Sequence, residues 1–539
     1  MTGHSSAFFC LLGLAGFLAL AGPAPAQAQE TGTQPDAAAT APTMAEVEQA
    51  WQRGDYVTVR TGLQHLAETT GTALAQYRYG RVLAEGRGGP RDLAGAVDWL
   101  TRAAGQNHVE AMTLLAQIYL SNISQAQDIP TGLARDPAKA SDLLARAAAL
   151  GHAEAQYRLG ILYGSGDGVD ADNTAAFNWL LAAAQQDYVE AQYELSRFYS
   201  RGIGTEQNNT EALRWLETAA QNNHIRAQFF LAAAYESGRG VEKNSGLALD
   251  WYRRAAENGL PIAMRNLGTL YLQGEAVKQN TEEGLRWLKA AAKAGDSGAM
   301  GNLGLAYAVG MGVAQDDARA AEWYNRASEY GLGRAKVALG RMHEAGRGVE
   351  QDMDRAIALY QQALETADAG QAAIRLAQLA AEGVLDGRIA PHRAIPWAIY
   401  AAGQGDAQSE AWLAKQAEAG MRDAQSGLAA LYLDREERAE EGARLLERAA
   451  RAGDPQAQAR LGELHMTGTH VPLDYVAAHK WFNIAATLGA ARAVELRETA
   501  GALMTPEQVA EAQAAARHWF EQEQPQPPKT EQTVTTVQE

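Results

Sequence analysis

The sequence predicts an all-α solenoid, in which about eleven helix hairpins of 36 residues stack between two helical caps. Three columns of residues recur every 36 positions and keep one register along the chain. They are Trp179, Trp215, Trp251, Trp287 and Trp323; Gly166, Gly202, Gly238, Gly274, Gly310 and Gly346; and Leu159, Leu195, Leu231, Leu267, Leu303 and Leu339. Because independent columns do not hold one register by chance, they indicate an internal repeat.

Extended in both directions, this frame gives eleven units, and every unit starts at an alanine. The starts are Ala75, Ala111, Ala155, Ala191, Ala227, Ala263, Ala299, Ala335, Ala372, Ala424 and Ala457. The second unit is eight residues longer, around 121–130, the ninth is sixteen residues longer, and the tenth is three residues shorter. The repeat therefore accounts for most of the chain.

Each unit is predicted to form two helices. In residues 155–163 the apolar and small residues recur at helical spacing, and this first helix should end at the glycine column, where a left-handed residue is needed. The second helix, as in residues 174–185, carries the tryptophan and a following Ala-Ala pair. Four residues before each unit start stands Gly, Asn or Asp, the residue types that tolerate a second left-handed turn. Two turns per unit close a hairpin.

Small residues in the repeat explain why the hairpins should stack. Alanine at the unit start and glycine at Gly160 and its equivalents let backbones approach closely, while Trp and Leu fill the space between layers. Burial of one such side chain stabilises the fold by roughly 2–3 kcal/mol, but a single hairpin has no second face to bury it against. Neighbouring hairpins must supply that face. We therefore expect the tryptophan column to serve packing rather than ligand stacking.

The N-terminus predicts export. Residues 7–21 form an apolar run that suits a signal peptide and is short for a membrane span, and small residues follow up to Ala28. We expect a signal peptide at 1–28 and a periplasmic location, with no membrane span in the mature chain. Cleavage would also remove Cys10, which is the single cysteine of the chain.

The predicted segments of the chain differ in how closely they follow the 36-residue repeat. The stretch 385–423 contains Pro391, Pro396 and the tryptophan Trp412, which lies outside the column. It is either a break in the array or simple drift of one repeat, and both interpretations stay open. The predicted segments are a disordered linker at 29–42, N-terminal capping helices at 43–74, regular repeats at 75–384, the irregular insertion at 385–423, further repeats at 424–492, a C-terminal capping helix at 493–520 and a disordered tail at 521–539.

Composition excludes several functional classes. Lys+Arg 47 against Asp+Glu 64 gives a formal charge of −17, and such a chain lacks the basic surface that nucleic-acid binding requires. One cysteine excludes a disulfide scaffold and a cysteine-based zinc site.

Short motifs for catalysis or metal binding all have a structural explanation. Gly-Asp-Ser-Gly at 295–298 resembles a serine-protease tetrapeptide but lies in the turn column, and the acidic loop at 166–173 lacks the spacing of a calcium site. His465, His470 and His479 do not have a recognised ligand spacing. We expect no catalytic, cofactor-binding or metal-ligating residue, and no cofactor.

The repeat resembles a known family. Units such as 155–163, followed by Gly166 and the Trp-Leu-Leu-Ala-Ala-Ala segment at 179–184, are similar to Sel-1-like repeats, which are related to tetratricopeptide repeats. The match spans about 75–492, and residues 504–519 are similar to the terminal helix of bacterial members. The resemblance implies a right-handed superhelix with protein or peptide partners on its concave side. It also implies adaptor roles in envelope signalling, secretion or exopolysaccharide control, without the disulfides of the cysteine-rich relatives.

The functional hypothesis is a non-enzymatic periplasmic scaffold that binds envelope proteins or peptides. One alternative is a factor or hydrolase that acts on cell-wall polymers, peptidoglycan or polysaccharide, and another is a subunit of a polysaccharide-export complex. The polymer alternative requires exposed aromatic residues that line a groove. The candidate partner-binding residues are Trp412, Tyr188 and Tyr330.

Overall fold

The structure is a computed structural model that describes residues 42–121, 134–274 and 278–523. All regular secondary structure in these ranges is helical, and the predicted all-α solenoid is confirmed. The predicted signal peptide at 1–28, the linker up to residue 41 and the tail from residue 524 lie outside the described residues, as does most of the extra length of the second repeat.

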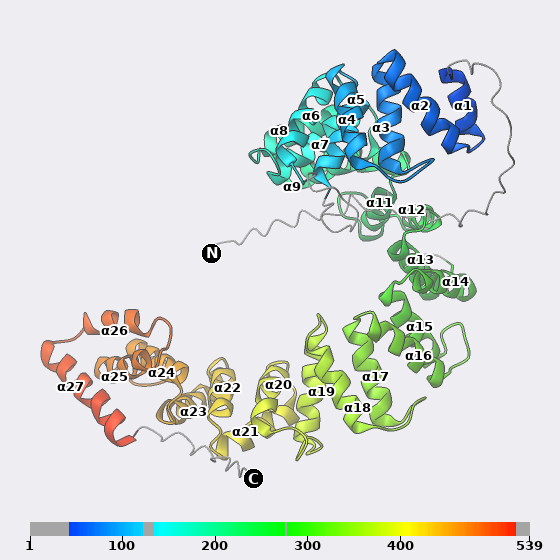
Figure 1. The fold of residues 1–539 in the computed structure, drawn as a ribbon. Helices are drawn as coiled ribbons and strands as arrows, with labels where there is room; N and C mark the ends of the chain where they lie inside the picture. Colours follow the sequence, from blue (N-terminus) through cyan, green and yellow to red (C-terminus); the bar gives the residue numbers. More distant parts are fainter. Residues whose placement is uncertain (1–41, 122–133, 275–277, 524–539) are drawn as a thin grey trace, which may run out of the picture. The chain divides into compact units, whose positions relative to one another are not determined.

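The chain divides into two compact units, and the division falls inside helix α13, between Leu267 and Gly268. In the first unit the hairpins follow one another in chain order (Figure 1). Its helices are α1 (Met44–Gln52), α2 (Tyr56–Thr70), α3 (Ala73–Glu85), α4 (Leu93–Gly105), α5 (Val109–Leu120), α6 (Pro137–Ala149), α7 (Ala153–Ser165), α8 (Asn173–Ala184), α9 (Val189–Arg201), α10 (Asn209–Gln221), α11 (Ile225–Ser237) and α12 (Ser245–Glu257), and α13 (Pro261–Gln273) follows.

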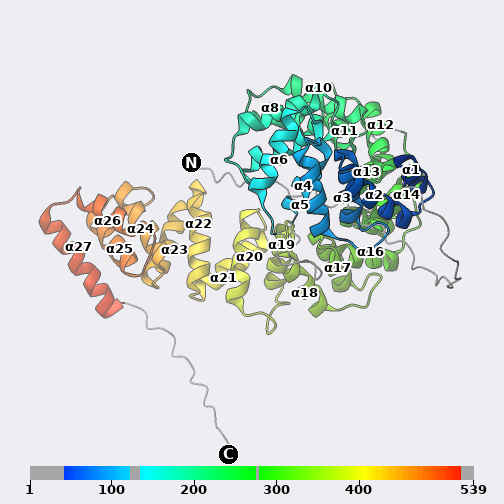
Figure 2. The ribbon, with the colours of Figure 1, turned by 45° about the horizontal axis from the view of Figure 1, so that its top comes forward.

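The second unit continues the same arrangement, and Figure 2 shows α22 to α27 in chain order at its end. Its helices are α14 (Thr281–Lys293), α15 (Ser297–Val309), α16 (Asp317–Glu329), α17 (Gly333–Ala345), α18 (Met353–Ala363), α19 (Ala369–Ala381), α20 (Pro391–Gly403), α21 (Ala407–Glu418), α22 (Arg422–Leu433), the 3-10 turn η3 (Glu436–Arg438), α23 (Ala439–Arg451), α24 (Pro455–Thr467), α25 (Tyr475–Thr487), α26 (Ala493–Gly501), α27 (Pro506–His518) and the π-helical turn η4 (Trp519–Glu523).

The turns form as the repeat predicts, with one exception. All nine glycines of the first turn column have φ between +65° and +76°. In the second turn column ten of the eleven residues are left-handed, but Asp368 has a φ of −94°. The expectation for Asp368 is corrected. Its carboxylate instead accepts a hydrogen bond from the backbone N–H of Arg334 at 2.8 Å, so the side chain joins α19 to the hairpin before it.

Asp or Asn side chains start most second helices. Each of them accepts a hydrogen bond from a backbone N–H in the first turn of its helix, which otherwise lacks an acceptor. These residues are Asp92, Asp136, Asp172, Asn208, Asn244, Asn280, Asp316, Asp352 and Asp474. The first helices begin about two residues before the alanine that marks each unit start.

The small-residue columns lie in the core. Every unit-start alanine is at most 2% exposed, and the leucine column is at most 3% exposed. Glycine at the sixth position of a unit lets the two helices of a hairpin approach closely. At Gly340 in α17, an added Cβ would lie 2.6 Å from Cε1 of Tyr360 in α18. The predicted close approach is therefore confirmed.

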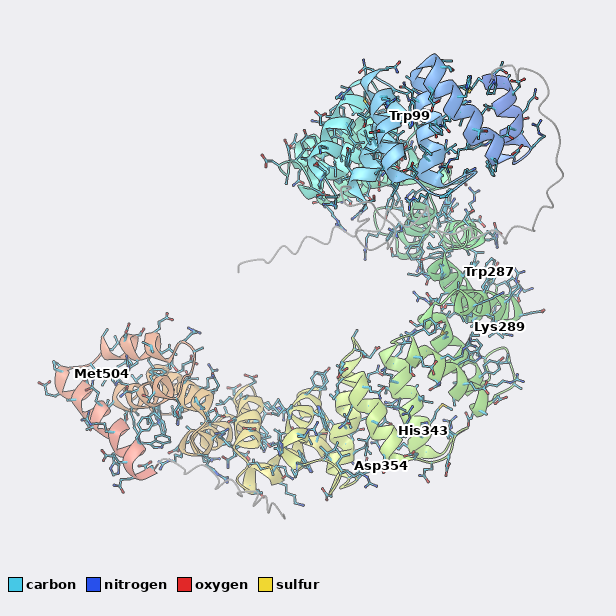
Figure 3. All side chains as sticks on the ribbon, viewed as in Figure 1. Trp99, Trp287, Lys289, His343, Asp354 and Met504 are labelled. Atoms are coloured by element: carbon cyan, nitrogen blue, oxygen red, sulfur yellow. The ribbon has the colours of Figure 1, made fainter. Side chains whose placement is uncertain are left out.

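The tryptophan column lies at the edge of the core and packs against it, as at Trp99, Trp179 and Trp251. Of its eight members only Trp215 and Trp481 are buried, and the other six, such as Trp99 and Trp287 (Figure 3), are half-buried. A cation lies 4.3–5.2 Å from the ring centroid in six cases. The pairs are Arg102–Trp99, Arg214–Trp215, Arg254–Trp251, Arg286–Trp287, Arg326–Trp323 and Lys480–Trp481. Because the cation is attracted to the ring face, the indole needs no neighbour to enclose it.

The region 385–423 is mostly helical. Helix α19 forms a hairpin with α20, which begins at Pro391 and contains Pro396. Helix α21 has no hairpin partner of its own and packs against both α20 and α22. Trp412 on α21 is half-buried against the apolar clusters on either side of it.

The predicted C-terminal capping segment, 493–520, contains two helices. Helix α26 ends at Gly501, and Thr505 starts α27 by forming a capping box with Gln508. Trp519, which follows α27, is fully buried in the C-terminal apolar cluster with Trp481.

Candidate functional site

The first helices of successive hairpins form one face of each unit. Helix α3 contacts α5 in the first unit, and α17 contacts α19 in the second. We call the surface formed by α3, α5, α7, α9 and α11, and in the second unit by α15, α17 and α19, the first-helix face.

A seam of side chains joins neighbouring first helices. In the first four units, the residue two positions after the unit start stacks on, or bonds to, the residue that caps the next first helix. Tyr77 stacks on His108 with centroids 4.6 Å apart, Tyr157 lies 5.2 Å from Tyr188, and Tyr193 lies 4.4 Å from His224. In the intervening hairpin the hydroxyl of Thr113 is 3.1 Å from Nδ1 of His152. The seam therefore fixes the spacing of the hairpins.

The seam explains the histidines of the turn column. In His108, His152 and His224, Nδ1 accepts the backbone N–H of the residue three positions later, at 3.1–3.3 Å. This cap requires a neutral ring. Burial lowers the pKa of His108, and burial together with the charge of Arg226 lowers that of His224 to about 4. These histidines start helices.

The three candidate partner-binding residues differ in exposure, and no contact joins them. Tyr188 is half-buried in the seam, Trp412 is half-buried on α21, and Tyr330 is 62% exposed at the end of α16. The expectation that all three rings are exposed is therefore corrected for Tyr188 and Trp412. Both rings pack between helices, and this packing partly buries them.

A column of buried glutamines was not predicted, although its pattern is visible in the sequence. Six units begin with Ala-Gln, and these glutamines, at positions 76, 156, 192, 228, 425 and 458, are buried. Gln156 donates to the carbonyl of Ala148 at the end of the preceding hairpin, and its Oε1 accepts from Gln186 at 2.7 Å. This pairing avoids the cost of an unpaired buried amide oxygen, whereas Oε1 of Gln425 and of Gln458 has no partner among the described residues. The glutamine column thus joins consecutive hairpins by hydrogen bonds.

The motifs considered for catalysis have structural roles. Asp296 caps α15 by accepting from the N–H of Ala299 at 2.7 Å, and Ser297 is the first residue of that helix. In the acidic loop Asp167 pairs with Arg135 and Asp172 caps α8. Within residues 42–121, 134–274 and 278–523, no group of three or more His, Cys, Asp or Glu side chains is placed to hold a metal ion. No helix in the described part of the chain has the length and apolarity of a membrane span.

The first-helix face of the second unit contains a cavity of about 470 Å³. Its lining comes from α15, α16, α17, α19 and the turn after α17, and comprises Ala308, Tyr324, Ala338, Arg341, Met342, Glu344, Ala345, Arg347 and Arg375. Positions 338, 341, 342 and 345 recur at helical spacing, so one stripe of α17 forms a wall. This cavity and its surroundings are the candidate site for a partner.

Ion pairs hold part of the cavity lining in place. Glu344 accepts from the Tyr360 hydroxyl at 2.7 Å and pairs with Arg375, whose Nη1 also bonds Glu382 at 2.9 Å. Burial opposes ionisation of Glu344, but the hydrogen bonds from Arg375 and Tyr360 prevail and lower its pKa. Arg347 pairs with Asp317 at 2.8 Å. The lining is therefore preorganised.

Comparisons with known proteins agree with this architecture. A model of the Sel1 repeat family matches ten segments, residues 73–108, 109–152, 153–188, 189–224, 225–260, 261–296, 297–332, 333–365, 422–454 and 455–489. These segments leave out 366–421, where α21 interrupts the alternation of hairpins. No curated protein matches the sequence.

The solved structures that are similar to the chain include the following two. The protein c5321, a protective antigen of uropathogenic Escherichia coli strains that displays an SLR fold, is 25% identical, covers 92% of this chain and 99% of its own, and has a TM-score of 0.53. A Sel1 repeat protein from Oxalobacter formigenes is 31% identical and covers 58% of this chain and 88% of its own, with a TM-score of 0.45. Since the family model covers most of the chain, the protein belongs to the Sel1 repeat family.

Proposed function

We propose that this Sel1 repeat protein is a non-enzymatic, exported scaffold that binds proteins or peptides of the cell envelope on its first-helix face. The fold is one that is typical of protein-interaction scaffolds. The proposed location in the periplasm is supported by the apolar run and small residues of the first 28 positions. The proposed pathways are those of the adaptors that it resembles: envelope signalling, secretion or exopolysaccharide control.

One observation carries the proposal. The recurring residues are used by the fold itself: alanine and leucine in the core, glycine in the turns, Asp and Asn as caps, and glutamine between hairpins. The exposed positions of the first helices vary instead. Leu305 on α15 is 48% exposed, and Arg341 occupies the same repeat position one hairpin later. Variable exposed side chains on a regular framework are the usual means by which solenoids select partners.

The polymer alternative has less support. Sugar rings bind to exposed aromatic faces, and of the three aromatic candidates only Tyr330 is exposed. A protein partner requires no such platform, because apolar contacts and hydrogen bonds at a preorganised face suffice.

Site-specific photo-cross-linking in living cells tests the proposal. A photoreactive phenylalanine analogue replaces Leu305 on the first-helix face or, as a control, Lys289, which is exposed on the second helix α14 (Figure 3). We expect light-dependent adducts with protein at position 305 and none at position 289. Equal adducts at both positions, or adducts with polysaccharide alone, would contradict the proposal. Fractionation of the same cells tests the periplasmic location.

A further inference from the structure

The cavity on α15, α17 and α19 has one cationic group whose hydrogen-bond donors are open. Its lining carries three guanidinium groups, of Arg341, Arg347 and Arg375, and a single carboxylate, of Glu344. Two of the three are engaged, because Arg347 pairs with Asp317 and Arg375 pairs with Glu344 and Glu382. Among the described residues, no side chain forms an ion pair or hydrogen bond with Arg341, which is exposed. Five N–H donors in a planar fork are therefore free.

The same arrangement excludes a cationic ligand. Glu344 is the carboxylate of the lining, and its oxygens already accept from Tyr360 and Arg375. A ligand with an ammonium group would meet Arg341 and the guanidinium of Arg347 without a free acceptor. Although the whole chain has a formal charge of −17, the lining of this cavity is locally basic.

Exposed apolar residues lie on and just beyond α15, the helix that supplies Ala308 to the cavity lining. Leu305 and Ala308 are three residues apart on α15, and Val309, which is 57% exposed, follows Ala308. Met311, just beyond the helix, is also exposed. Ala338 and Ala345 of α17 contribute short side chains to the lining, which leave room for a ligand. Apolar side chains together with a guanidinium suit a ligand that is aliphatic at one point and anionic at the next.

We propose that this cavity binds a peptide segment of the partner in which a carboxylate, from Asp, Glu or a chain end, lies close to an aliphatic side chain. The carboxylate accepts hydrogen bonds from Arg341, and the aliphatic side chain packs on Leu305 and Val309. Arg375 and Glu344 position the lining and do not bond the ligand. This inference rests on the proposed function, since it names the chemistry of the partner that the first-helix face accepts.

Peptide selection tests the inference on the purified full chain. The probe is a phage-displayed library of random dodecapeptides, from which bound members are synthesised in two forms, one with each Asp or Glu and one with the corresponding amide. We expect selected peptides that combine an acidic and an aliphatic residue, with the amide form bound at least about tenfold more weakly, because a charge-assisted hydrogen bond is lost.

Two charge-matched variants assign the effect to the cavity. Arg341→Gln and Lys289→Gln each remove one exposed positive charge from the second unit. Arg341→Gln should abolish the difference between the acid and amide forms, and Lys289→Gln should retain it. Leu305→Ser should weaken both forms. Because Arg341 bonds no described residue, its variant should keep the thermal stability of the parent chain.

The inference is overturned if no peptide is enriched, if selected peptides lack acidic residues, or if the two charge variants behave alike. These outcomes differ from failure of the proposed function. Protein adducts at position 305 together with a negative peptide result would leave the scaffold proposal standing and reject the carboxylate ligand. Absence of protein adducts at position 305 would reject the scaffold proposal itself.

Discussion

The ring of Tyr193 in α9 stacks on the imidazole of His224, with centroids 4.4 Å apart and planes inclined by 20°. Nδ1 of the same imidazole accepts the backbone N–H of Ala227 at 3.1 Å and so starts α11. One side chain thus caps a helix and joins it to the preceding hairpin. Local helix formation and stacking of the repeats are coupled at this residue.

Replacement of His224 should separate these two roles. His224→Ala loses the cap and the ring contact, and we expect a loss of about 1–2 kcal/mol in the local stability of α11. His224→Asp should recover part of it, because Asp caps the first helix at the equivalent position 296. Hydrogen exchange of the α11 amides measures the effect, since stacks of repeats do not unfold as one unit. Equal losses in both variants would show that the cap contributes nothing.

The stability of the first unit should depend on pH through His224. Its pKa is about 4 in the folded chain, against an ordinary value near 6.5. Between these two values the unfolded chain binds a proton that the folded chain does not, so stability should fall as the pH decreases from about 6.5 to about 4, by up to ~1.4 kcal/mol per pH unit. Above pH 6.5 this group should have no effect.

Thermal unfolding of the parent chain and of His224→Gln at pH 7.5, 6, 5 and 4 checks this dependence. Carboxylates titrate in both proteins, so the difference between the two isolates the histidine. We expect the stability advantage of the parent chain to shrink across this range. A constant difference would show that His224 keeps its ordinary pKa in the folded chain.

The close approach of α17 to α18 should make Gly340→Ala destabilising. The added methyl group would lie 2.6 Å from the Tyr360 ring, which must move, at a cost of about 1–3 kcal/mol. Gly403→Ala is the matched control, because its Cβ would meet only Leu431 at 3.6 Å. There the higher helix propensity of alanine should leave stability unchanged or raise it by up to ~1 kcal/mol. Urea denaturation of both variants decides between these outcomes.

The pair between Arg375 and Glu344 should stabilise the second unit. Their side chains are only 18% and 20% exposed, so loss of one partner leaves a poorly solvated charge. Arg375→Gln should cost about 1–3 kcal/mol. The double variant Arg375→Gln/Glu344→Gln should cost less than the sum of the two single changes, and a double-mutant cycle in urea measures this coupling. Additive losses would mean that the two residues do not interact.

Deletion of a whole hairpin should be tolerated, whereas deletion of half a hairpin should not. Removal of 189–224, which spans α9 and α10, leaves Tyr188 in the capping position before α11. The shortened chain should keep its helical circular dichroism and a cooperative melting transition. Removal of 189–206 leaves α10 without its partner helix and should cause loss of cooperative melting. Similar damage from both deletions would contradict a stack of separable hairpins.

Much of the fold follows from the sequence because a repeat places equivalent residues in equivalent environments. Gly166 and the other members of its column predicted the left-handed turns, and Ala155 and its equivalents predicted the buried small-residue contacts. Asp368 escaped this reasoning, since it belongs to the turn column by position but bonds to the hairpin before it.

The candidate site was predicted less well. Tyr188 and Trp412 were selected as aromatic residues with no obvious packing role, and both pack between helices. The contact between Tyr193 and His224 was not predicted. The sequence positions of both residues are visible in the repeat, but a recurring residue type does not indicate which side chain of the neighbouring hairpin it contacts. The basic cavity could not be predicted either, as its lining residues come from five separate segments.

The sequence by itself determined the helix hairpin, its period and its turns, because these depend on local conformational preference and on the burial of recurring apolar residues. Only the tertiary structure decided which side chains meet across hairpins, such as Tyr193 with His224 and Arg375 with Glu344. Such contacts join residues about thirty positions apart. They depend on the distance and rotation between stacked helices, which a period in the sequence does not contain.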